Sequence, residues 1–323
     1  MNPLISIILP VYNRPIVVNT IKSVLNQTYS DFELIIIDNA STDSTVSEIR
    51  KINDERIKLY VNEVNKGQTF SLNRGLGLAK GKYIARIDSD DLMYPNRIEE
   101  QVAFLESHDS YVICGSWITL FSDDDKEKGV LPYCKEDDNI KFISTFLCPF
   151  AHPAVMFRRD VIEKYNVRYD ETLRMAEDYD MWIRILKYGK GFNIDKPLIY
   201  YRQGTNNDSY KYHMDMKKET FVVMEYVAQN CNWLSYSKED YMQLIKIARE
   251  ENKNLYRIVK CYLMWNRYFE ENIKKNNIEY QMMKKLFRSF INQICFLDNN
   301  SMFAKCVHAI HKQIKRRKEA KLK

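Results

Sequence analysis

The sequence predicts an α/β fold, in which a mostly parallel sheet is flanked by helices and followed by an α-helical C-terminal region. Three observations predict this fold. Short apolar runs alternate with helical patterns in the first part of the chain, which is typical of βαβ units with right-handed crossovers. Polar and acidic residues directly follow several of these runs, where open parallel sheets bind their ligands. Beyond about residue 212 the pattern is helical and holds little Gly or Pro.

Four strands are expected in the first part of the chain, at 4–9, 32–38, 56–61 and 82–88. The first two are continuous β-rich runs, which are typical of parallel strands covered on both faces. Helices are expected between the strands, and the third of them covers 68–79. Asn13 is expected near the N-cap of the first helix, with Pro15 in the first turn.

The second part of the sheet is expected to be mixed. A strand-like stretch at 110–121 leads into a polar, acidic loop at 122–128, and a later helix starts near Glu177 and Asp178. Two changes of pattern set the domain boundaries. One lies near residue 108, and the other is the start of a purely helical pattern near residue 212. We expect a domain at 1–208, with halves at 1–107 and 108–208, and a helical region with a basic tail at 209–323.

Composition narrows the class of protein. The chain has 323 residues, of which 45% are hydrophobic, enough to bury a core. The N-terminus lacks a basic n-region and reaches Pro10 too soon for a signal peptide, and no apolar run reaches the length of a spanning helix, so we expect a cytoplasmic protein. The seven cysteines show no CxxC spacing. They are interpreted as mostly buried, reduced thiols, in preference to a zinc site.

Positive charge is concentrated in the C-terminal part. Residues 211–323 hold 23 Lys and Arg against 12 Asp and Glu, whereas residues 1–210 hold 26 against 31. Residues 301–323 form an amphipathic helical pattern that ends in KQIKRRKEAKLK. Such a helix could lie on an anionic membrane at the inner face of the cell, with each Lys or Arg contributing about 1 kcal/mol. The alternative is a docking helix with a solvated tail. Nucleic-acid binding is not expected, because no aromatic platform or recognition motif accompanies the charge.

An acidic turn raises the central question of the sequence. Asp88, Asp90 and Asp91 follow the fourth predicted strand, and such carboxylates repel one another unless a cation or a well-solvated turn relieves them. Because the carboxyl ends of parallel strands meet at one edge, 10–13 after the first strand and Asp38-Asn39 after the second should lie beside this turn. That convergence favours a ligand site.

An EF-hand is excluded by spacing. Asp88, Asp90 and Glu99 fit its first, third and twelfth positions, but Leu92 and Met93 occupy the places of a ligand and of the obligatory Gly.

Five segments in order give a more specific interpretation: SIILPVYNRP, SVLNQTYSDFELIIIDNASTDST, NKGQTFSLNRGLGLAKGKYIARIDSDD, HPAVMFRRD and AEDYDMWIRI. Together they resemble the family-2 glycosyltransferases of the GT-A fold, from about Leu4 to Arg202. The resemblance implies an inverting, metal-dependent enzyme that moves a hexosyl or N-acetylhexosaminyl group from a nucleoside-diphosphate sugar to a saccharide acceptor. It also suggests bacterial surface polysaccharide biosynthesis with a lipid-linked acceptor. The Gln-X-X-Arg-Trp signature of processive relatives is absent, so a single sugar is expected per encounter.

The resemblance assigns the acidic turn to a metal and a donor. Asp88 and Asp90 would face the nucleotide-sugar and hold Mn²⁺ or Mg²⁺ against its diphosphate. A hard cation with so few protein carboxylates needs phosphate oxygens, so metal and donor are expected to bind together. The metal would neutralise charge on the departing diphosphate. Asp91 either supports this shell or caps the helix that begins near Pro95, and both interpretations stay open.

Further positions match the family's nucleoside-binding residues: Pro10, Tyr12, Asp38, Asn39, Arg86, Asp88 and Ser89. Asn39 is a departure, because relatives that use uridine diphosphate sugars often carry a second Asp there. Its amide oxygen can still accept a proton from a base. Uridine is preferred, followed by thymidine and guanosine. For Tyr12 the alternative is a packed aromatic side chain at a strand end.

Glu177 and Asp178 match the family's Glu-Asp motif, in which the Asp is the general base for the acceptor hydroxyl. The alternative is an N-cap pair for the helix that follows. His152 matches the family's His-Pro pair and either lines the donor pocket or has a structural role. A different class of protein is also considered, a catalytically inactive scaffold that binds a partner enzyme or a membrane. The joint presence of Asp88, Asp90 and Asp178 argues against it.

Overall fold

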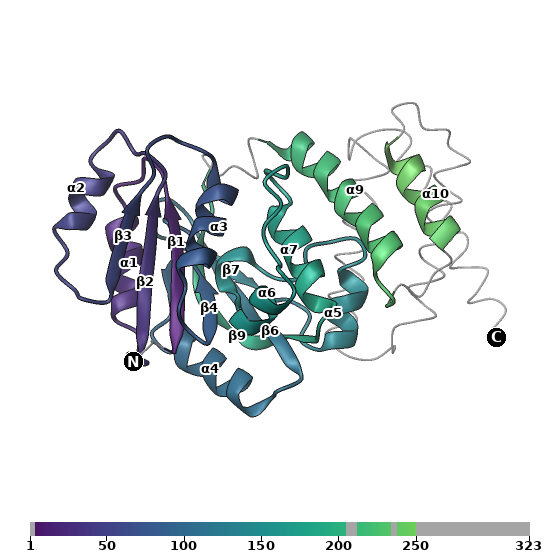
Figure 1. Cartoon of the computed structure of the whole chain (residues 1–323), viewed down its shortest axis with the longest axis horizontal. Helices are drawn as coiled ribbons and strands as arrows, with labels where there is room; N and C mark the ends of the chain where they lie inside the picture. Colours follow the sequence, from purple (N-terminus) through teal and green to yellow (C-terminus); the bar gives the residue numbers. More distant parts are fainter. Residues whose placement is uncertain (1–3, 205–211, 234–237, 250–323) are drawn as a thin grey trace. The chain divides into compact units, whose positions relative to one another are not determined.

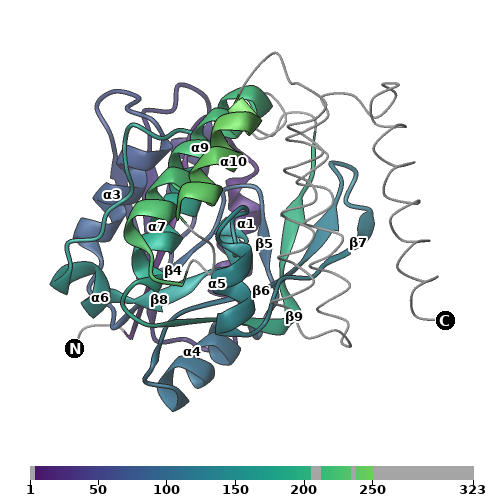
Figure 2. The same cartoon turned by 90° about the vertical axis from the view of Figure 1, so that its right-hand side faces the viewer.

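The computed structural model describes residues 4–204, 212–233 and 238–249. Contacts divide the chain into two units, Met1–Trp233 and Leu234–Lys323, and helix α10 (Lys238–Arg249) is the described part of the second. The first unit reaches beyond residue 208 and includes α9 (His213–Asn230), which packs against α7 (Glu177–Leu186) (Figures 1 and 2). The basic helix expected at 301–323 lies outside the described residues.

The first unit contains a mixed sheet with the order β3-β2-β1-β4-β8-β6-β9-β5 and β7 beside β6 (Figures 1 and 2). Its strands are β1 (Ile5–Val11), β2 (Phe32–Asp38), β3 (Ile57–Val61), β4 (Tyr83–Arg86), β5 (Leu92–Met93), β6 (Tyr111–Phe121), β7 (Glu127–Leu131), β8 (Met156–Arg158) and β9 (Lys190–Arg202). The first four run parallel, as predicted. The mixed continuation is also confirmed, because β8 is antiparallel to both β4 and β6 whereas β9 is parallel to β6.

Helices cover both faces of the sheet: α1 (Val17–Leu25), α2 (Thr45–Arg50), α3 (Gln68–Leu78), α4 (Arg97–Ser107), α5 (Asp137–Ile143), α6 (Arg159–Lys164) and α7, with a 3₁₀ turn η1 (His152–Ala154). In β1, Ile5, Ile7 and Leu9 belong to the core cluster that includes α1 and α4. Ile8 points to the opposite face, toward α3. There a Cβ on Gly75 would come within 2.6 Å of the Ile8 side chain, so the glycine permits the close helix–strand approach.

The start of α1 differs from the prediction. The helix begins at Val17 with Ile16 as its N-cap residue, so the expected capping role of Asn13 is wrong. Asn13 instead has φ 45°, a left-handed conformation that Asn tolerates. Its Oδ1 accepts a hydrogen bond from Thr42 N at 2.8 Å, and its own N–H donates to Ser41 Oγ at 2.8 Å. Asn13 therefore ties the loop after β1 to the loop after β2.

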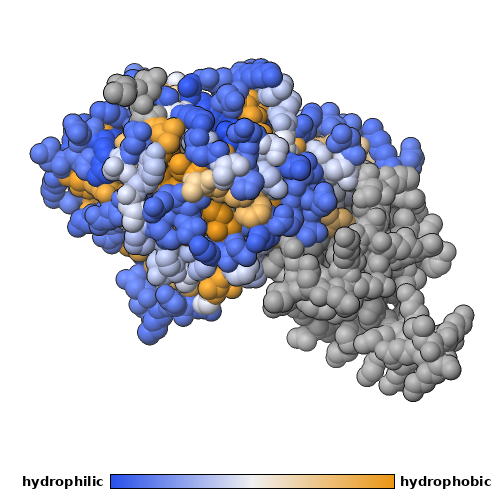
Figure 3. Space-filling view, turned by 90° about the horizontal axis from the view of Figure 1, so that it is seen from below, coloured by the Kyte–Doolittle hydropathy of each residue, from blue (hydrophilic) through white to orange (hydrophobic). Residues whose placement is uncertain are grey.

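The surface seen in Figure 3 carries small apolar patches among mostly hydrophilic side chains. Cys114, Cys148 and Cys231 are free thiols; Cys114 is buried as predicted, whereas Cys148 and Cys231 are half-buried. Within the described ranges, no helix combines the length and the apolarity needed to cross a bilayer.

Candidate active site

The carboxyl ends of β1, β2 and β4 meet at one edge of the sheet. The register pairs Val11 with Asp38 and Ile8 with Arg86, so the loops that follow these strands are neighbours. Because β8 runs opposite to β4, it begins at this same edge, where Arg86 N donates to Val155 O at 3.3 Å. The antiparallel strand thus brings η1, with His152, beside the acidic turn.

Two clefts open along this edge. The first has a volume of about 870 Å³ and includes, of the predicted site residues, Pro10, Tyr12, Asn39, Asp88 and Ser89. The second has a volume of about 840 Å³ and includes Asp88, Ser89, Asp90, Asp91, His152, Glu177 and Asp178. Arg14, Gln68 and Arg174 also line both clefts. The two clefts therefore meet at Asp88 and Ser89, with arginines from two different loops at the junction.

Each acid of the turn has a different partner within the protein. Asp88 accepts two hydrogen bonds from the buried Arg86 guanidinium. Asp90 Oδ2 lies 3.6 Å from Arg14 Nη1. Asp91 Oδ1 accepts the backbone N–H of Arg202 at 2.8 Å. Protein cations and a backbone donor thus relieve the crowding of the carboxylates, and in the part of the chain that the structure describes no group of three His, Cys, Asp or Glu side chains could hold a metal ion by itself.

Burial dominates the electrostatics of this turn. It raises the pKa of Asp90, and the negative charge of Asp88 adds to that shift while the cation of Arg14 opposes it. Burial also raises the pKa of Asp91 well above its usual range. The cap interpretation of Asp91 is wrong, because α4 begins at Arg97, follows Asn96 and has no side-chain cap. Asp91 instead ties the acidic turn to the end of β9.

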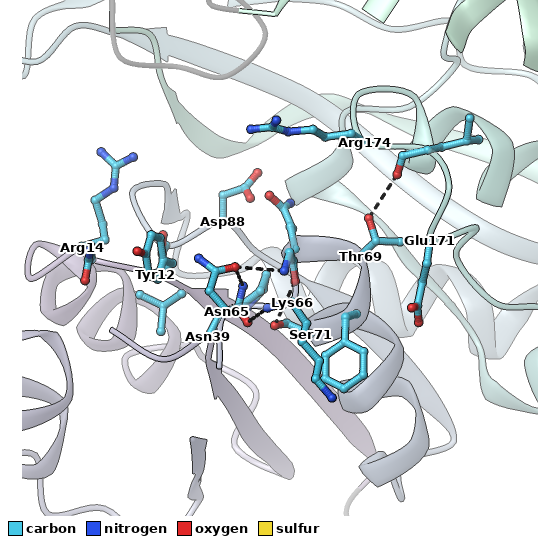
Figure 4. A pocket seen from close by; sticks show the side chains of 18 residues that line it. Tyr12, Arg14, Asn39, Asn65, Lys66, Thr69, Ser71, Asp88, Glu171 and Arg174 are labelled. Atoms are coloured by element: carbon cyan, nitrogen blue, oxygen red, sulfur yellow. Dashed lines mark hydrogen bonds between the residues drawn. The ribbon is translucent and has the colours of Figure 1, made fainter. Parts of the chain in front are cut away.

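Of the predicted nucleoside-binding positions, Pro10, Tyr12 and Asn39 line the first cleft and Asp38 is buried outside its lining. Asp38 Oδ2 accepts a hydrogen bond from Ser41 N at 2.9 Å, whereas its Oδ1 is buried and accepts none from the described residues. Asn39 Oδ1 accepts a hydrogen bond from Lys66 N at 3.1 Å (Figure 4). It accepts another from Asn62 Nδ2 at 2.9 Å. Its amide oxygen thus already accepts two hydrogen bonds from the protein, and Asp38 is fully buried and lines neither cleft.

Tyr12 is 45% exposed at the first cleft, so the alternative of a packed aromatic is wrong. In Figure 4 Asp88 lies between Arg14, on the same side as Tyr12, and Arg174 across the cleft. An exposed ring followed by two cations is a surface that can hold a planar base and then a chain of phosphates.

The predicted Glu-Asp pair opens α7. The N-cap residue of this helix is Ala176, so the interpretation of the pair as a simple N-cap is wrong. Asp178 Oδ1 accepts Tyr179 N at 2.6 Å, and its Oδ2 lies 3.5 Å from the Cys148 thiol. Burial raises the pKa of Asp178 to about 6 and that of Glu177 to about 8, where the charge of Asp178 also contributes.

His152 lines the second cleft and not the first. Its Nε2 lies 3.3 Å from the Tyr169 hydroxyl, and its ring centroid lies 5.7 Å from that of the buried Trp182. Burial holds the pKa of His152 well below its usual value, with a further contribution from the cation of Arg86. The neutral imidazole is therefore packed into the wall of the second cleft.

Several residues of this site were not predicted from the sequence. Arg14 lies in the segment SIILPVYNRP, and its positive charge directly after Asn13 could have indicated a role at the site. Arg174 and Cys148 lie in irregular segments whose path the sequence does not indicate. Arg202 ends β9 and reaches the acidic turn only through sheet pairing across 111 positions of sequence.

Solved structures share this fold. The chain superposes on S. aureus TarS in complex with UDP with a TM-score of 0.59 at 19% identity, over 91% of this chain and 81% of that one. The mannosyltransferase PcManGT from Pyrobaculum calidifontis, in complex with GDP-Man and Mn²⁺, gives 0.59 at 14% identity, over 92% and 85%. The fold is therefore the GT-A fold of glycosyltransferases.

Sequence comparison adds the family. The family described as glycosyl transferase family 2 matches residues 6–166. EpsE of Bacillus subtilis (strain 168), named as a glycosyltransferase, is 34% identical over 252 residues, which cover 76% of this chain and 87% of EpsE. The O-antigen biosynthesis glycosyltransferase WbnJ of Escherichia coli is 36% identical over 206 residues, which cover 62% and 79%. The chain belongs to glycosyl transferase family 2.

Proposed function

We propose that this glycosyltransferase is inverting and metal-dependent, and that it moves a single sugar from a nucleoside-diphosphate sugar to a saccharide acceptor. The observation that carries this proposal is the meeting of two clefts at Asp88. One cleft is lined by Pro10, Tyr12 and Asn39 of the predicted nucleoside-binding positions, and the other by Asp178, whose pKa is raised to about 6. A donor in the first cleft would present its sugar to an acceptor in the second.

The first cleft suits a uridine nucleotide. Tyr12 offers an exposed ring for the base. Asp38 Oδ1 has no partner among the described residues but is fully buried outside the lining of the cleft, so it could accept the N–H of a base only after a local opening. Leaving such an oxygen unpaired is costly, so a ligand donor at this point gains affinity. Thymidine presents the same edge and is second, and guanosine is third. Arg14 and Arg174 are placed to pair with the phosphates.

The acidic turn suits Mn²⁺ or Mg²⁺ that arrives with the donor. Asp88 and Asp90 both line the second cleft, and Asp90 Oδ2 makes a long contact of 3.6 Å with Arg14 Nη1. They would supply one or two carboxylates and leave the remaining positions to phosphate oxygens and water. When bound, the metal neutralises negative charge on the leaving diphosphate. Arg14 is placed to share in that stabilisation.

Asp178 is the proposed general base. Its raised pKa makes it a stronger base than an ordinary carboxylate, and the group is still ionised near neutral pH. The acceptor hydroxyl would pass its proton to Asp178 while its oxygen attacks the anomeric carbon, opposite the departing diphosphate. The bond to the diphosphate breaks as the new glycosidic bond forms, which inverts the anomeric configuration.

The named activity of a relative suggests the biological setting. WbnJ is named for O-antigen biosynthesis, so we propose that this chain acts in bacterial surface polysaccharide biosynthesis. A lipid-linked acceptor would place it at the cytoplasmic face of the membrane, where the basic residues at 301–323 could contact anionic lipid.

A donor screen tests this proposal. UDP-, dTDP- and GDP-sugars are assayed with and without Mn²⁺ by thermal shift and by release of the diphosphate. We expect a uridine nucleotide to stabilise the protein most, and only with the metal. NMR of the product should show an anomeric configuration opposite to that of the donor. Failure of every nucleotide to bind would instead support the inactive scaffold.

A further inference from the structure

The Glu219 carboxylate on α9 holds the loop that leads into Glu177 and the proposed base Asp178. Glu219 Oε2 accepts hydrogen bonds from three consecutive backbone N–H groups, those of Arg174 at 2.9 Å, Met175 at 2.6 Å and Ala176 at 3.0 Å. Hydrogen bonds to a charged acceptor are about twice as strong as neutral ones. These three bonds join segments 43 to 45 positions apart in the sequence.

The loop 174–176 connects the two clefts to the proposed base. Arg174 lines both clefts and Met175 lines the second. Ala176 is the N-cap residue of α7, whose second residue is Asp178. The Arg174 guanidinium also lies 4.0 Å from the centroid of the Tyr212 ring, just before α9. A shift of this loop would therefore move Arg174, which lines the first cleft, and Asp178, which lines the second, at the same time.

We infer that Glu219 is a positioning residue for the transfer reaction. Its carboxylate fixes 174–176 and thereby the reach of Asp178 toward the acceptor hydroxyl. This inference rests on the function proposed above. A displacement of about 1 Å at a reacting group can cost about 10²-fold in rate, so a loop released by one carboxylate is expected to slow transfer strongly. Glu219 lines neither cleft, and it acts through the loop.

The packing of α9 does not depend on Glu219 alone. Val223, Met224 and Val227 on this helix are buried. Tyr226 lies under Arg184 of α7, 4.9 Å from the guanidinium to the ring centroid, and its hydroxyl accepts a hydrogen bond from Lys187 at 3.3 Å. Loss of the Glu219 carboxylate should therefore free the loop while α9 stays in place.

The same helix offers a matched control. Asp215 is an exposed acid one turn before Glu219, and it faces Lys218 at 3.9 Å rather than the loop. The test compares E219A and E219Q with D215N in the full chain. Amide hydrogen exchange of 174–176 is followed by mass spectrometry, UDP binding with Mn²⁺ by calorimetry, and kcat with the donor that the screen identifies.

In E219A we expect exchange at 174–176 to accelerate about tenfold or more, because three protecting hydrogen bonds are lost. The value of kcat should fall about 10²-fold. The affinity for UDP with Mn²⁺ should fall by a smaller factor, because Arg174 shifts with the loop while Tyr12 and Arg14 stay in place. E219Q keeps an acceptor oxygen without the charge and should be intermediate in both measurements. D215N should match the wild type.

Unchanged exchange in E219A would overturn the anchoring contact, and faster exchange with an unchanged kcat would overturn its role in positioning. A wild-type chain that turns over no nucleotide-sugar would refute the proposed function instead, and the exchange measurement would still decide whether Glu219 holds the loop.

Discussion

The Cys148 thiol donates a hydrogen bond to Asp178 Oδ2, with 3.5 Å between sulfur and oxygen, at the wall of the second cleft. Burial raises the pKa of Asp178, and this hydrogen bond opposes the rise because it favours the carboxylate. Burial, followed by the charge of Asp178, raises the pKa of the Cys148 thiol well above its usual value, so the thiol remains a protonated donor. The thiol therefore contributes, after the Tyr179 N–H, to holding down the pKa that burial raises.

Transfer should depend on pH through Asp178. A base with a pKa of about 6 accepts a proton only when ionised, so kcat should be high above that value and fall about tenfold per unit below it. D178N should lower the plateau kcat above this pKa by about 10²–10⁴-fold and remove the acid limb. The profile of kcat between about pH 5 and pH 8 checks this expectation. A flat profile, or full transfer by D178N that retains UDP binding, would move the base to another residue.

Removal of the Cys148 hydrogen bond should raise the pKa of Asp178 further. In C148A the acid limb of the kcat profile is expected to shift to higher pH, while the plateau rate at high pH changes little. C148S retains a hydroxyl donor and should restore the wild-type limb. An identical limb in all three proteins would show that the 3.5 Å contact does not influence the base.

Deletion of the Asp90 charge should uncouple the metal from the nucleotide. In D90N the affinity for UDP in the presence of Mn²⁺ is expected to fall by at least about 10–100-fold. Mutation of residues that only orient the ligands of a metal already lowers metal affinity by this factor. Calorimetric titration with UDP, with Mn²⁺ and with EDTA, measures this loss. D109N serves as the control, because Asp109 is fully exposed. Normal metal-dependent binding by D90N would contradict the assignment.

Tyr12 should contribute to nucleotide binding and little to stability. Because its ring is 45% exposed, Y12A should leave the free energy of unfolding within about 0.5 kcal/mol of the wild type. Loss of base stacking should weaken UDP binding by ~1–3 kcal/mol, and Y12F should bind normally. Calorimetry and urea unfolding separate the two effects. A destabilised Y12A with normal UDP affinity would restore a packing role.

Asp91 should contribute to stability through Arg202. D91A leaves the buried N–H of Arg202 without its acceptor, at a cost of about 1–3 kcal/mol in the free energy of unfolding. D91N retains an oxygen at this position and should cost less. Urea unfolding of both variants measures the difference. Equal stability of D91A and the wild type would refute the bond between the acidic turn and β9 as a stabilising contact.

The sequence by itself determined the parallel half of the sheet and the edge that carries the site. Continuous apolar runs can be buried on both faces only within such a sheet, and each predicted run became a strand at nearly its expected position. Polar residues just after Val11, Asp38 and Arg86 had to meet, because parallel strands end at the same edge. The acidic turn and the Glu-Asp pair could be recognised as motifs because the residues of each are contiguous in the sequence.

Only the tertiary structure decided which partner each acid has. Hydrogen bonds such as Arg202 with Asp91, or Glu219 with Arg174, join residues 111 and 45 positions apart. No local period in a sequence encodes such a contact. The direction of β8 likewise follows from pairing with β4, which brings His152 to the edge. Local pattern reports burial and backbone conformation, whereas the chemistry of this site depends on which distant charges folding places within a few ångströms.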